Sequence, residues 1–585
     1  MPAIEAGFAR GIKGPIVESL SHDILIIGGG GAGLRAAIAA AEHNPKLDIV
    51  IASKTYPMRS HTVSAEGGMA AATREYDSLD KHAFDTIKGS DFLADQDAVE
   101  YFVSECPREA VLLEHWGCPF SRDPDGRISV RAFGGMSVKR TLFAGDKIGF
   151  HMLHTLFQTS LKHENIHRYD EWFATSILVE DGHASGVTAI NMRTGEMSSI
   201  LAKAVVLSTG GCGRIYKFTT NGWIKTGDGM ALAYRAGVPL KDMEMVQFHP
   251  TLLPNTGILM TEAARGEGGY LINKDGERFL KRYLPGKMEL GPRDIISRSE
   301  MTEIKEGRGF EGPYGSYVLL DIRHLGEDVI NKKLSFLKEL AEKYAGVDPV
   351  HEPIPVRPGQ HYIMGGVNTD KTGYTGIPGL YGAGEMACVS INGANRLGSN
   401  SLTECLVFGA AAGKAAAEYA MRQSMPHLGN PLQGVAMQEE TRVYDQVMKH
   451  EGGERISSIR SEMQSTMDES VGIYRDENGL SQATRKIAEL KDRMRNASVE
   501  DRDHVFNTEL VSALELDFML DVAETIAYSA LYRRESRGAH TRTDYTNRDD
   551  AQFLKHSMAY WDHGRPRIQY SPVTITRWQP EARVY

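Results

Sequence analysis

Side chains suited to binding a carboxylate and to transferring a proton recur in five short segments of this sequence. Arginine, histidine and hydroxyl donors bind carboxylates most strongly when they converge in a site closed from water. Each candidate also has a simpler interpretation: His249 precedes a proline and can merely cap a turn, and Arg293 beside Asp294 is typical of a surface ion pair. The candidates are His249 in QFHPTLLP, Thr261, Glu262 and Arg265 in LMTEAARGEGG, Arg293 in MELGPRD, His361 in RPGQHYIMGG and Arg396 in GANRLGSNS.

A nucleotide fold near the N-terminus is the first element that could position these groups. Gly28, Gly30 and Gly33 form a GxGxxG pattern between an apolar strand at 23–28 and an alanine-rich helix at 34–43. In this context the glycines allow a tight turn, a close approach to a pyrophosphate and helix–strand packing, with the phosphates at the helix N-terminus. A second strand is expected at 47–52, which completes a βαβ unit.

The end of that second strand bears on which dinucleotide is bound. A ribose-binding acid normally follows the fingerprint by about 20 residues. Here the strand ends at Ser53 and Lys54, without a carboxylate. This argues against simple NAD binding, and the serine hydroxyl would have to hold the ribose.

The next segment, YPMRSHTVSAEGGMAAA at 56–72, has small residues that let the backbone lie against a planar ring. An isolated histidine such as His61 is usually an ordinary loop residue. The run R-S-H-T-x-x-A-x-G-G, however, resembles the covalent flavin segment of the succinate dehydrogenase and fumarate reductase flavoproteins. The resemblance implies a covalent FAD, bonded at its 8α-methyl by His61. The missing acid and this segment together favour FAD over NAD.

The resemblance covers about 22–580, and the segment 131–161 is most similar to the fumarate reductase version. It implies that Asp228 lies on the FAD, that Glu385 contacts the ribityl chain, and that Ser401 and Leu402 offer backbone groups to the isoalloxazine. Residues 172–174 match the segment at the adenine end. The full set of expected FAD residues is Gly28, Gly30, Gly31, Ala32, Gly33, Ser53, Lys54, Ser60, His61, Thr62, Ser64, Ala65, Glu66, Gly67, Gly68, Trp172, Phe173, Ala174, Asp228, Glu385, Arg396, Ser401 and Leu402.

The resemblance also assigns roles around a C4 dicarboxylate substrate. It implies that His249, Thr261, His361 and Arg396 hold the two carboxylates, with His249 also counted among the catalytic residues. It implies that flavin N5 exchanges the hydride and that Arg293 exchanges the proton, relayed through Glu262 and Arg265. An arginine acid has a free pKa above ~12, so this role requires a second cation and a dry site.

Two positions depart from the family pattern. The family usually has histidine where this chain has Asn392, which can hydrogen-bond but cannot carry charge. We therefore expect the electrostatics of the flavin or substrate site to differ from the family pattern. The segment between Arg282 and Met288 is also short compared with enterobacterial fumarate reductases, which we expect to trim a loop.

The fold class expected is α/β: a Rossmann-like FAD domain with an inserted α+β capping domain, a helical bundle and a tail. Similar strand-type segments occur at 204–211 and 379–385, and the sequence between them has a different pattern. This predicts that the FAD domain is discontinuous. The segment RRESRGAH at 533–540 is either a solvated basic run or a support for the FAD site. The expected boundaries are 1–22 for an extension, 23–244 with 359–424 for the FAD domain, 245–358 for the capping domain, 425–535 for the helices and 536–585 for the tail.

Composition limits partners and location. A net charge of −10 argues against nucleic-acid binding, and five scattered cysteines predict reduced buried thiols without a cluster or metal in this chain. No apolar window reaches the ~18 residues of a membrane span, and no signal peptide is recognisable. The resemblance implies an iron–sulfur subunit, membrane-anchor subunits and a quinone, and hence a peripheral position on the cytoplasmic side of the membrane.

Rival functions stay open at this point. A soluble aspartate oxidase of the same superfamily lacks the histidine at position 61, and a soluble fumarate reductase coupled to thiols or haem would need a donor site that this chain does not display. A non-enzymatic FAD-binding scaffold has no need of His249, Arg265, Arg293 and Arg396 together. Direction is open between fumarate reduction and succinate oxidation, because one transition state serves both. The similarity to fumarate reductase favours reduction slightly.

Overall fold

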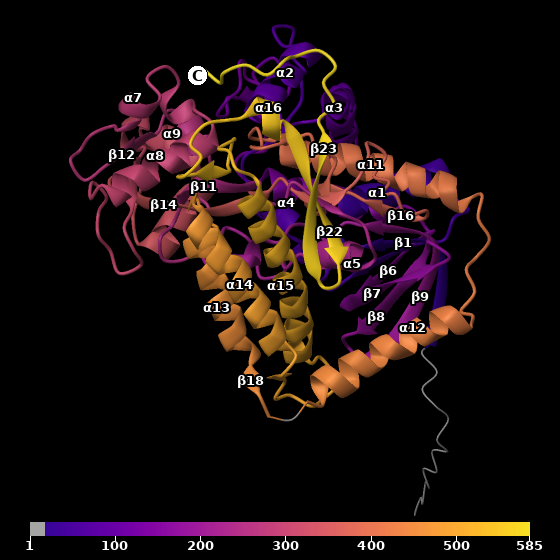
Figure 1. Cartoon of the computed structure of the whole chain (residues 1–585). Coiled ribbons are helices and arrows are strands. Elements are labelled where there is room, and N and C mark those ends of the chain that lie inside the picture. Colours follow the sequence, from indigo (N-terminus) through magenta and orange to yellow (C-terminus); the bar gives the residue numbers. More distant parts are fainter. Residues whose placement is uncertain (1–17, 451, 585) are drawn as a thin grey trace, which may run out of the picture.

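A seven-stranded sheet forms the centre of the larger α/β part of the molecule. The computed structural model describes residues 18–450 and 452–584; the larger part of the expected N-terminal extension, 1–17, lies outside them. The strand order is β6-β2-β1-β9-β8-β7, and β16 also pairs with β9. Figure 1 shows β1, β6, β7, β8, β9 and β16 together on one side of the molecule. The strands are β1 (Glu18–Ile27), β2 (Ile49–Ser53), β6 (Ile166–Asp170), β7 (Trp172–Glu180), β8 (His183–Asn191), β9 (Glu196–Leu207) and β16 (Leu380–Gly382).

The parallel strands of this sheet come from distant parts of the sequence. Ile27 pairs with Leu207 across β1 and β9, and Leu380 of β16 pairs with Val205. The two strand-type segments on either side of the intervening region thus share one sheet, as the sequence predicts. Strand β1 begins at residue 18, inside the expected extension, because residues 18–22 also pair with β9.

Two helices rich in small residues cover one face of this sheet. Helix α1 (Gly31–His43) packs against α11 (Asn400–Ala420). The two backbones meet at Gly413, where an added Cβ would lie 2.1 Å from the carbonyl oxygen of Ala36. The close approach of the two helices therefore requires a glycine at this position.

Gly413→Ala is expected to destabilise the protein by ~3 kcal/mol, the upper range for forcing a methyl group into a packed core. The measurement is the thermal unfolding midpoint of the purified flavoprotein. Gly434→Ala is the matched control, because Gly434 lies in helix α12 (Asn430–Thr441) and a Cβ there meets nothing within 4 Å. That control should gain ~0.5–1 kcal/mol from helix propensity. Equal effects of both substitutions would contradict the packing argument.

A separate hydrophobic core lies in the intervening region. A four-stranded sheet of order β11-β14-β13-β12 packs against helix α8 (Arg293–Lys305). Its core includes Leu253, Ile296, Leu320 and Val356. The sheet is made of β11 (Val246–Leu252), β12 (Tyr270–Ile272), β13 (Val318–Asp321) and β14 (Ile354–Ile363).

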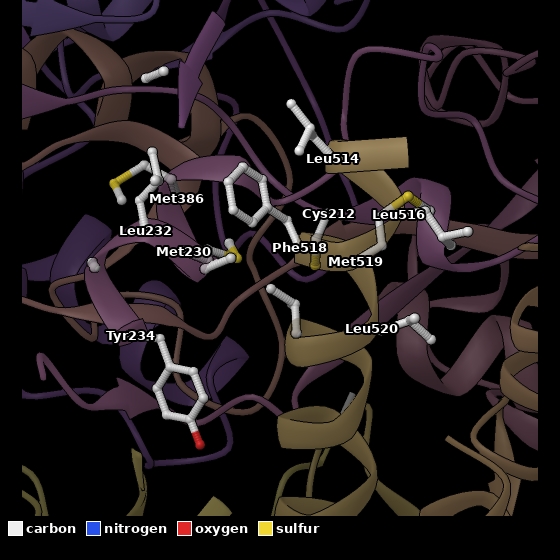
Figure 2. Packing of buried hydrophobic residues seen from close by; sticks show 14 of the residues in the cluster. Cys212, Met230, Leu232, Tyr234, Met386, Leu514, Leu516, Phe518, Met519 and Leu520 are labelled. Carbon is white, nitrogen blue, oxygen red and sulfur yellow. The ribbon is translucent and has the colours of Figure 1, made fainter. Parts of the chain in front are cut away.

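Three long helices follow the nucleotide part: α13 (Ile456–Ser470), α14 (Glu477–Met494) and α15 (Thr508–Tyr532). All three helices lie within 425–535, the region where the sequence predicts a helical bundle. Helix α15 is buried on nearly all sides, and Phe518 and Met519 lie close to Met230 of helix α5 (Asp228–Arg235) (Figure 2). This contact joins the helical part to the nucleotide part in one core.

The tail folds back onto the body rather than into solvent. Strands β22 (Lys555–Asp562) and β23 (Arg565–Pro572) form a hairpin, and β22 pairs with β10 (Leu240–Lys241). In RRESRGAH, Arg533 and Arg537 are fully buried against Glu535, and Arg533 also donates to Glu244. The interpretation of this segment as a solvated basic run was therefore wrong.

Two expected absences can be examined over the described residues. Within 18–450 and 452–584, no helix combines the length and apolarity that a membrane span needs. The same residues contain no group of histidine, cysteine and acidic side chains arranged to hold a metal. All five cysteines are free, and four of them are buried.

Candidate functional site

One cavity of about 730 Å³ runs from the glycine loop to the intervening region. It is lined by every expected FAD residue except Gly33, and by five of the expected substrate and catalytic residues: His249, Thr261, Glu262, Arg293 and His361. Arg396, expected in both sets, lines it as well. Gly33 lies just behind the wall, where a Cβ would come within 1.9 Å of the Gly28 carbonyl oxygen. Its role is therefore helix–strand packing.

The nucleotide end of the cavity combines a helix N-terminus with a fixed cation. Gly30 caps α1, and the Gly31 N–H donates to the Thr62 hydroxyl at 3.1 Å. Lys54 at the end of β2 donates to Asp228 at 2.7 Å and to Glu515 at 2.6 Å. Lys54 thus sets a positive charge beside Asp228, which lines the same end of the cavity.

His61 lies in a short 3-10 turn (His61–Ser64) against helix α4 (Ile148–Ser160). Its Nδ1 accepts a hydrogen bond from the Gly222 N–H at 3.4 Å. Burial, followed by the charges of Lys225 and Arg214, lowers the pKa of His61 to about 3. The imidazole is therefore neutral at physiological pH, which leaves it available as a nucleophile.

Four buried polar atoms of the cavity wall have no hydrogen-bond partner among the described residues. They belong to Ser60 (Oγ), Glu66 (Oε2), His249 (Nε2) and Arg396 (Nε). Buried polar groups are normally satisfied, so unpaired atoms around a cavity point to a bound polar group. Together with the glycine loop at the other end, they fit an FAD and an anionic substrate.

His249 and His361 form a pair of neutral imidazoles on β11 and β14, with ring centroids 5.0 Å apart. The Thr251 N–H donates to His249 Nδ1 at 3.2 Å, so the proton of the neutral ring lies on Nε2. Burial, reinforced by Arg293, lowers the pKa of both rings well below the usual value. Both can donate hydrogen bonds but neither carries charge at neutral pH.

Arg293 is held by a buried carboxylate rather than by its neighbour in sequence. Its Nε donates to Glu262 at 2.7 Å and its Nη1 donates to Gln247 at 2.9 Å. Asp294 instead pairs with Arg583 at 2.5 Å. The interpretation of Arg293 and Asp294 as a surface ion pair was therefore wrong.

Arg265 lies outside the cavity, behind Glu262. Its Nη2 is 3.7 Å from Glu262 Oε1, and its Nη1 donates to the Glu289 carbonyl. Burial alone would raise the pKa of Glu262, but Arg293 and Arg265 outweigh it and hold that pKa below its usual value. Burial, partly offset by Glu262, lowers the pKa of Arg265. The three groups form a continuous buried chain that ends at the cavity.

The structure adds three residues that the sequence patterns did not single out. Lys225 forms an ion pair with Glu385, Gln247 accepts from Arg293, and the ring of Tyr362 lies under Arg396 at 4.2 Å. Gln247 stands two positions from His249 and Tyr362 directly follows His361, so the same motifs contained the signal. Lys225 pairs with a residue 160 positions away, and only the fold brings them together.

Comparison with known proteins places this architecture among characterised families. Residues 23–402 match the family model described as an FAD binding domain, and residues 460–585 match that of the fumarate reductase flavoprotein C-terminus. The chain is 58% identical to the fumarate reductase flavoprotein subunit of Mycobacterium tuberculosis over 96% of this chain and 99% of the relative.

A more distant relative and a solved structure agree with this match. The succinate dehydrogenase flavoprotein subunit of Rickettsia bellii is 42% identical, with 96% of each chain covered. Among solved structures, a variant of the E. coli quinol fumarate reductase superimposes with a TM-score of 0.95 at 50% identity, covering 97% of this chain and 99% of that chain.

Proposed function

The chain belongs to the fumarate reductase and succinate dehydrogenase flavoprotein family, and we propose that it interconverts fumarate and succinate as the flavoprotein subunit of a quinol–fumarate reductase complex. The observation that carries this proposal is the single cavity that joins the glycine loop and His61 to the buried arginines and histidines. FAD bound in this cavity supplies the hydride donor or acceptor next to the substrate.

Substrate binding rests on donors that the protein itself leaves unpaired. His249 Nε2 and Arg396 Nε have no partner among the described residues. Because these donors are fixed before the substrate arrives, little reorganisation opposes binding of a dicarboxylate. We assign one substrate carboxylate to His249 with Thr261 and the other to His361 with Arg396.

Proton exchange is assigned to Arg293. Its bonds to Glu262 and Gln247 fix the guanidinium at the wall of the cavity. Glu262 then passes the proton between Arg293 and Arg265, along the buried chain described above.

The finer features of the cofactor and the complex remain proposals. We infer that His61 bonds the 8α-position of the FAD, a reaction for which its neutral imidazole is suited. We also infer that electrons pass through an iron–sulfur subunit to membrane-anchor subunits and a quinone, which would hold the chain at the cytoplasmic face of the membrane. The expected units at 23–244 with 359–424, 245–358, 425–535 and 536–585 are likewise proposed as domains, with the separate core around Leu320 in support of the second.

The direction of the reaction is tested with the purified complex. Fumarate reduction by a low-potential quinol is expected to exceed succinate oxidation by a high-potential quinone. The greater sequence identity to the relative named as a fumarate reductase favours this outcome. Rapid succinate oxidation with feeble fumarate reduction would assign the chain to the succinate dehydrogenases instead. Failure of both reactions would overturn the proposed function.

A further inference from the structure

A buried carboxyl lies one layer behind the substrate arginine. Glu404, in the first turns of α11, accepts a hydrogen bond from the Tyr362 hydroxyl at 2.8 Å. The Tyr362 ring in turn lies 4.2 Å from the Arg396 guanidinium carbon. Tyr362 thus links Glu404 to Arg396, whose charges also act on each other, and Glu404 does not line the cavity itself.

The partner of Glu404 on its other side is the residue that departs from the family pattern. Asn392 donates its amide N–H to the same carboxylate oxygen, Oε2, at 3.0 Å. The Asn392 carbonyl oxygen is buried and has no partner among the described residues. A histidine at this position could pair with the carboxylate as a cation, whereas an amide cannot. In this chain the bond from position 392 therefore brings no positive charge to Glu404.

We propose that Glu404 is a positioning residue for Arg396, acting through Tyr362, and that Asn392 leaves this carboxyl free to gain and lose a proton. The inference rests on the function proposed above, and it makes the affinity for a dicarboxylate depend on pH. When Glu404 is ionised, its negative charge lies behind Arg396 and opposes the binding of an anion. When Glu404 is protonated, Arg396 offers its full charge to the substrate.

The charges around Glu404 place this change near neutral pH. Burial raises the pKa of Glu404 to about 7, opposed by hydrogen bonds from Asn392 and Tyr362 and by the charge of Arg396. The other charged group facing it is Glu385, which also raises the pKa and is itself paired with Lys225. The neighbouring thiol of Cys405 has a pKa of about 12 and stays neutral.

Most other cavity residues with a shifted pKa do not change protonation state near pH 7. The pKa of His61 falls to about 3, and those of His249 and His361 are also lowered, so the three rings remain neutral. Glu262 remains ionised because its pKa is lowered. Glu66 is the exception to separate by experiment, because burial raises its pKa well above the usual value.

The experiment measures the KM for fumarate and the inhibition constant of malonate, a non-reactive dicarboxylate, from pH 6 to pH 8.5 on the assembled complex. In the unmodified enzyme both constants should rise roughly five- to tenfold as pH passes about 7, the size expected for one added charge near a partly screened anion site. In Glu404→Gln, which keeps hydrogen-bonding groups but cannot ionise, the rise should disappear.

Two further variants test whether the pH dependence comes from Glu404. Asn392→His should shift the rise to lower pH without abolishing it, because a cationic imidazole beside the carboxyl stabilises its ionised form. Asp468→Asn is the matched control: burial raises the pKa of Asp468 to about 6, but it bonds the Phe218 N–H and does not line the cavity. Its pH profile should match that of the unmodified enzyme.

The outcomes separate this inference from the proposed function. A profile that stays steep in Glu404→Gln, or that flattens only in Glu66→Gln, would overturn the role of Glu404 while fumarate reduction persists. A flat profile in the unmodified enzyme would overturn it as well. If the unmodified enzyme neither reduces fumarate nor binds malonate, the proposed function itself fails.

Discussion

Replacing Arg293 by glutamine is expected to lower the rate of fumarate reduction by roughly a thousandfold, within the range for loss of a positioned general acid. Glutamine cannot donate a proton to a developing carbanion, and it also leaves Glu262 without its closest cation, 2.6 Å away. The measurement is steady-state fumarate reduction with a reduced viologen dye as the electron donor. The flavin absorbance of the purified variant should remain, since Arg293 is assigned no role in holding FAD.

Arg298→Gln is the control for this prediction. Arg298 lies on the same helix, five residues further along, and donates to the Gly538 carbonyl at 2.6 Å, away from the cavity. Its replacement should cost less than about threefold in rate. An Arg293→Gln enzyme that keeps a tenth of the activity would show that another group delivers the proton.

Replacing His61 by serine is expected to leave FAD bound but no longer attached. Denaturing electrophoresis in acid should show flavin fluorescence in the band of the unmodified protein and none in the variant. Succinate oxidation should fall more than about tenfold, and by more than fumarate reduction falls. The reason is thermodynamic, because a covalently attached imidazole would withdraw electrons from the flavin and make it a better oxidant; each tenfold change in rate corresponds to ~1.4 kcal/mol.

His167→Ser is the comparison variant, because His167 is half-exposed on β6 and pairs with Asp48 rather than facing the cavity. It should keep both the fluorescent band and the ratio of the two activities. A dark band in the unmodified protein would disprove the covalent link. Equal losses of both activities in His61→Ser would contradict the thermodynamic argument. They would not contradict the proposal of a covalent link in the unmodified protein.

Much of the nucleotide end of the site could be predicted from the sequence, because its geometry is local. The glycine loop, the strand before it and the helix after it lie within 26 residues, from Glu18 to His43, and glycine spacing reports directly on the turn. The expected substrate residues also line the cavity, since each came from a short motif with a recognisable pattern. Their roles stay predictions until the variants above are measured.

What the sequence could not provide depends on pairs of residues far apart. The residues next to Arg293 favoured an ion pair with Asp294, and only the family resemblance pointed to Glu262, 31 residues earlier. The basic segment after α15 was equally ambiguous, because burial of Arg533 depends on Glu244, 289 residues away. Local spacing carries no information on such pairs, and the energy of a buried charge is decided by its distant partner.

The pairing of β16 with β9 sets the order in which the molecule can be completed during synthesis. The sheet under the glycine loop needs Gly382, which follows Leu207 by 175 residues. At a translation rate of about 5–20 residues per second, roughly 20–80 s pass between the first residue and the last strand of this sheet. Until then residues 205–207 of β9 lack their pairing with β16, although β1 can already pair with both β2 and β9. The cofactor can therefore meet a finished binding surface only after the whole intervening region has left the ribosome, and pairings this distant in sequence are the slow ones to form.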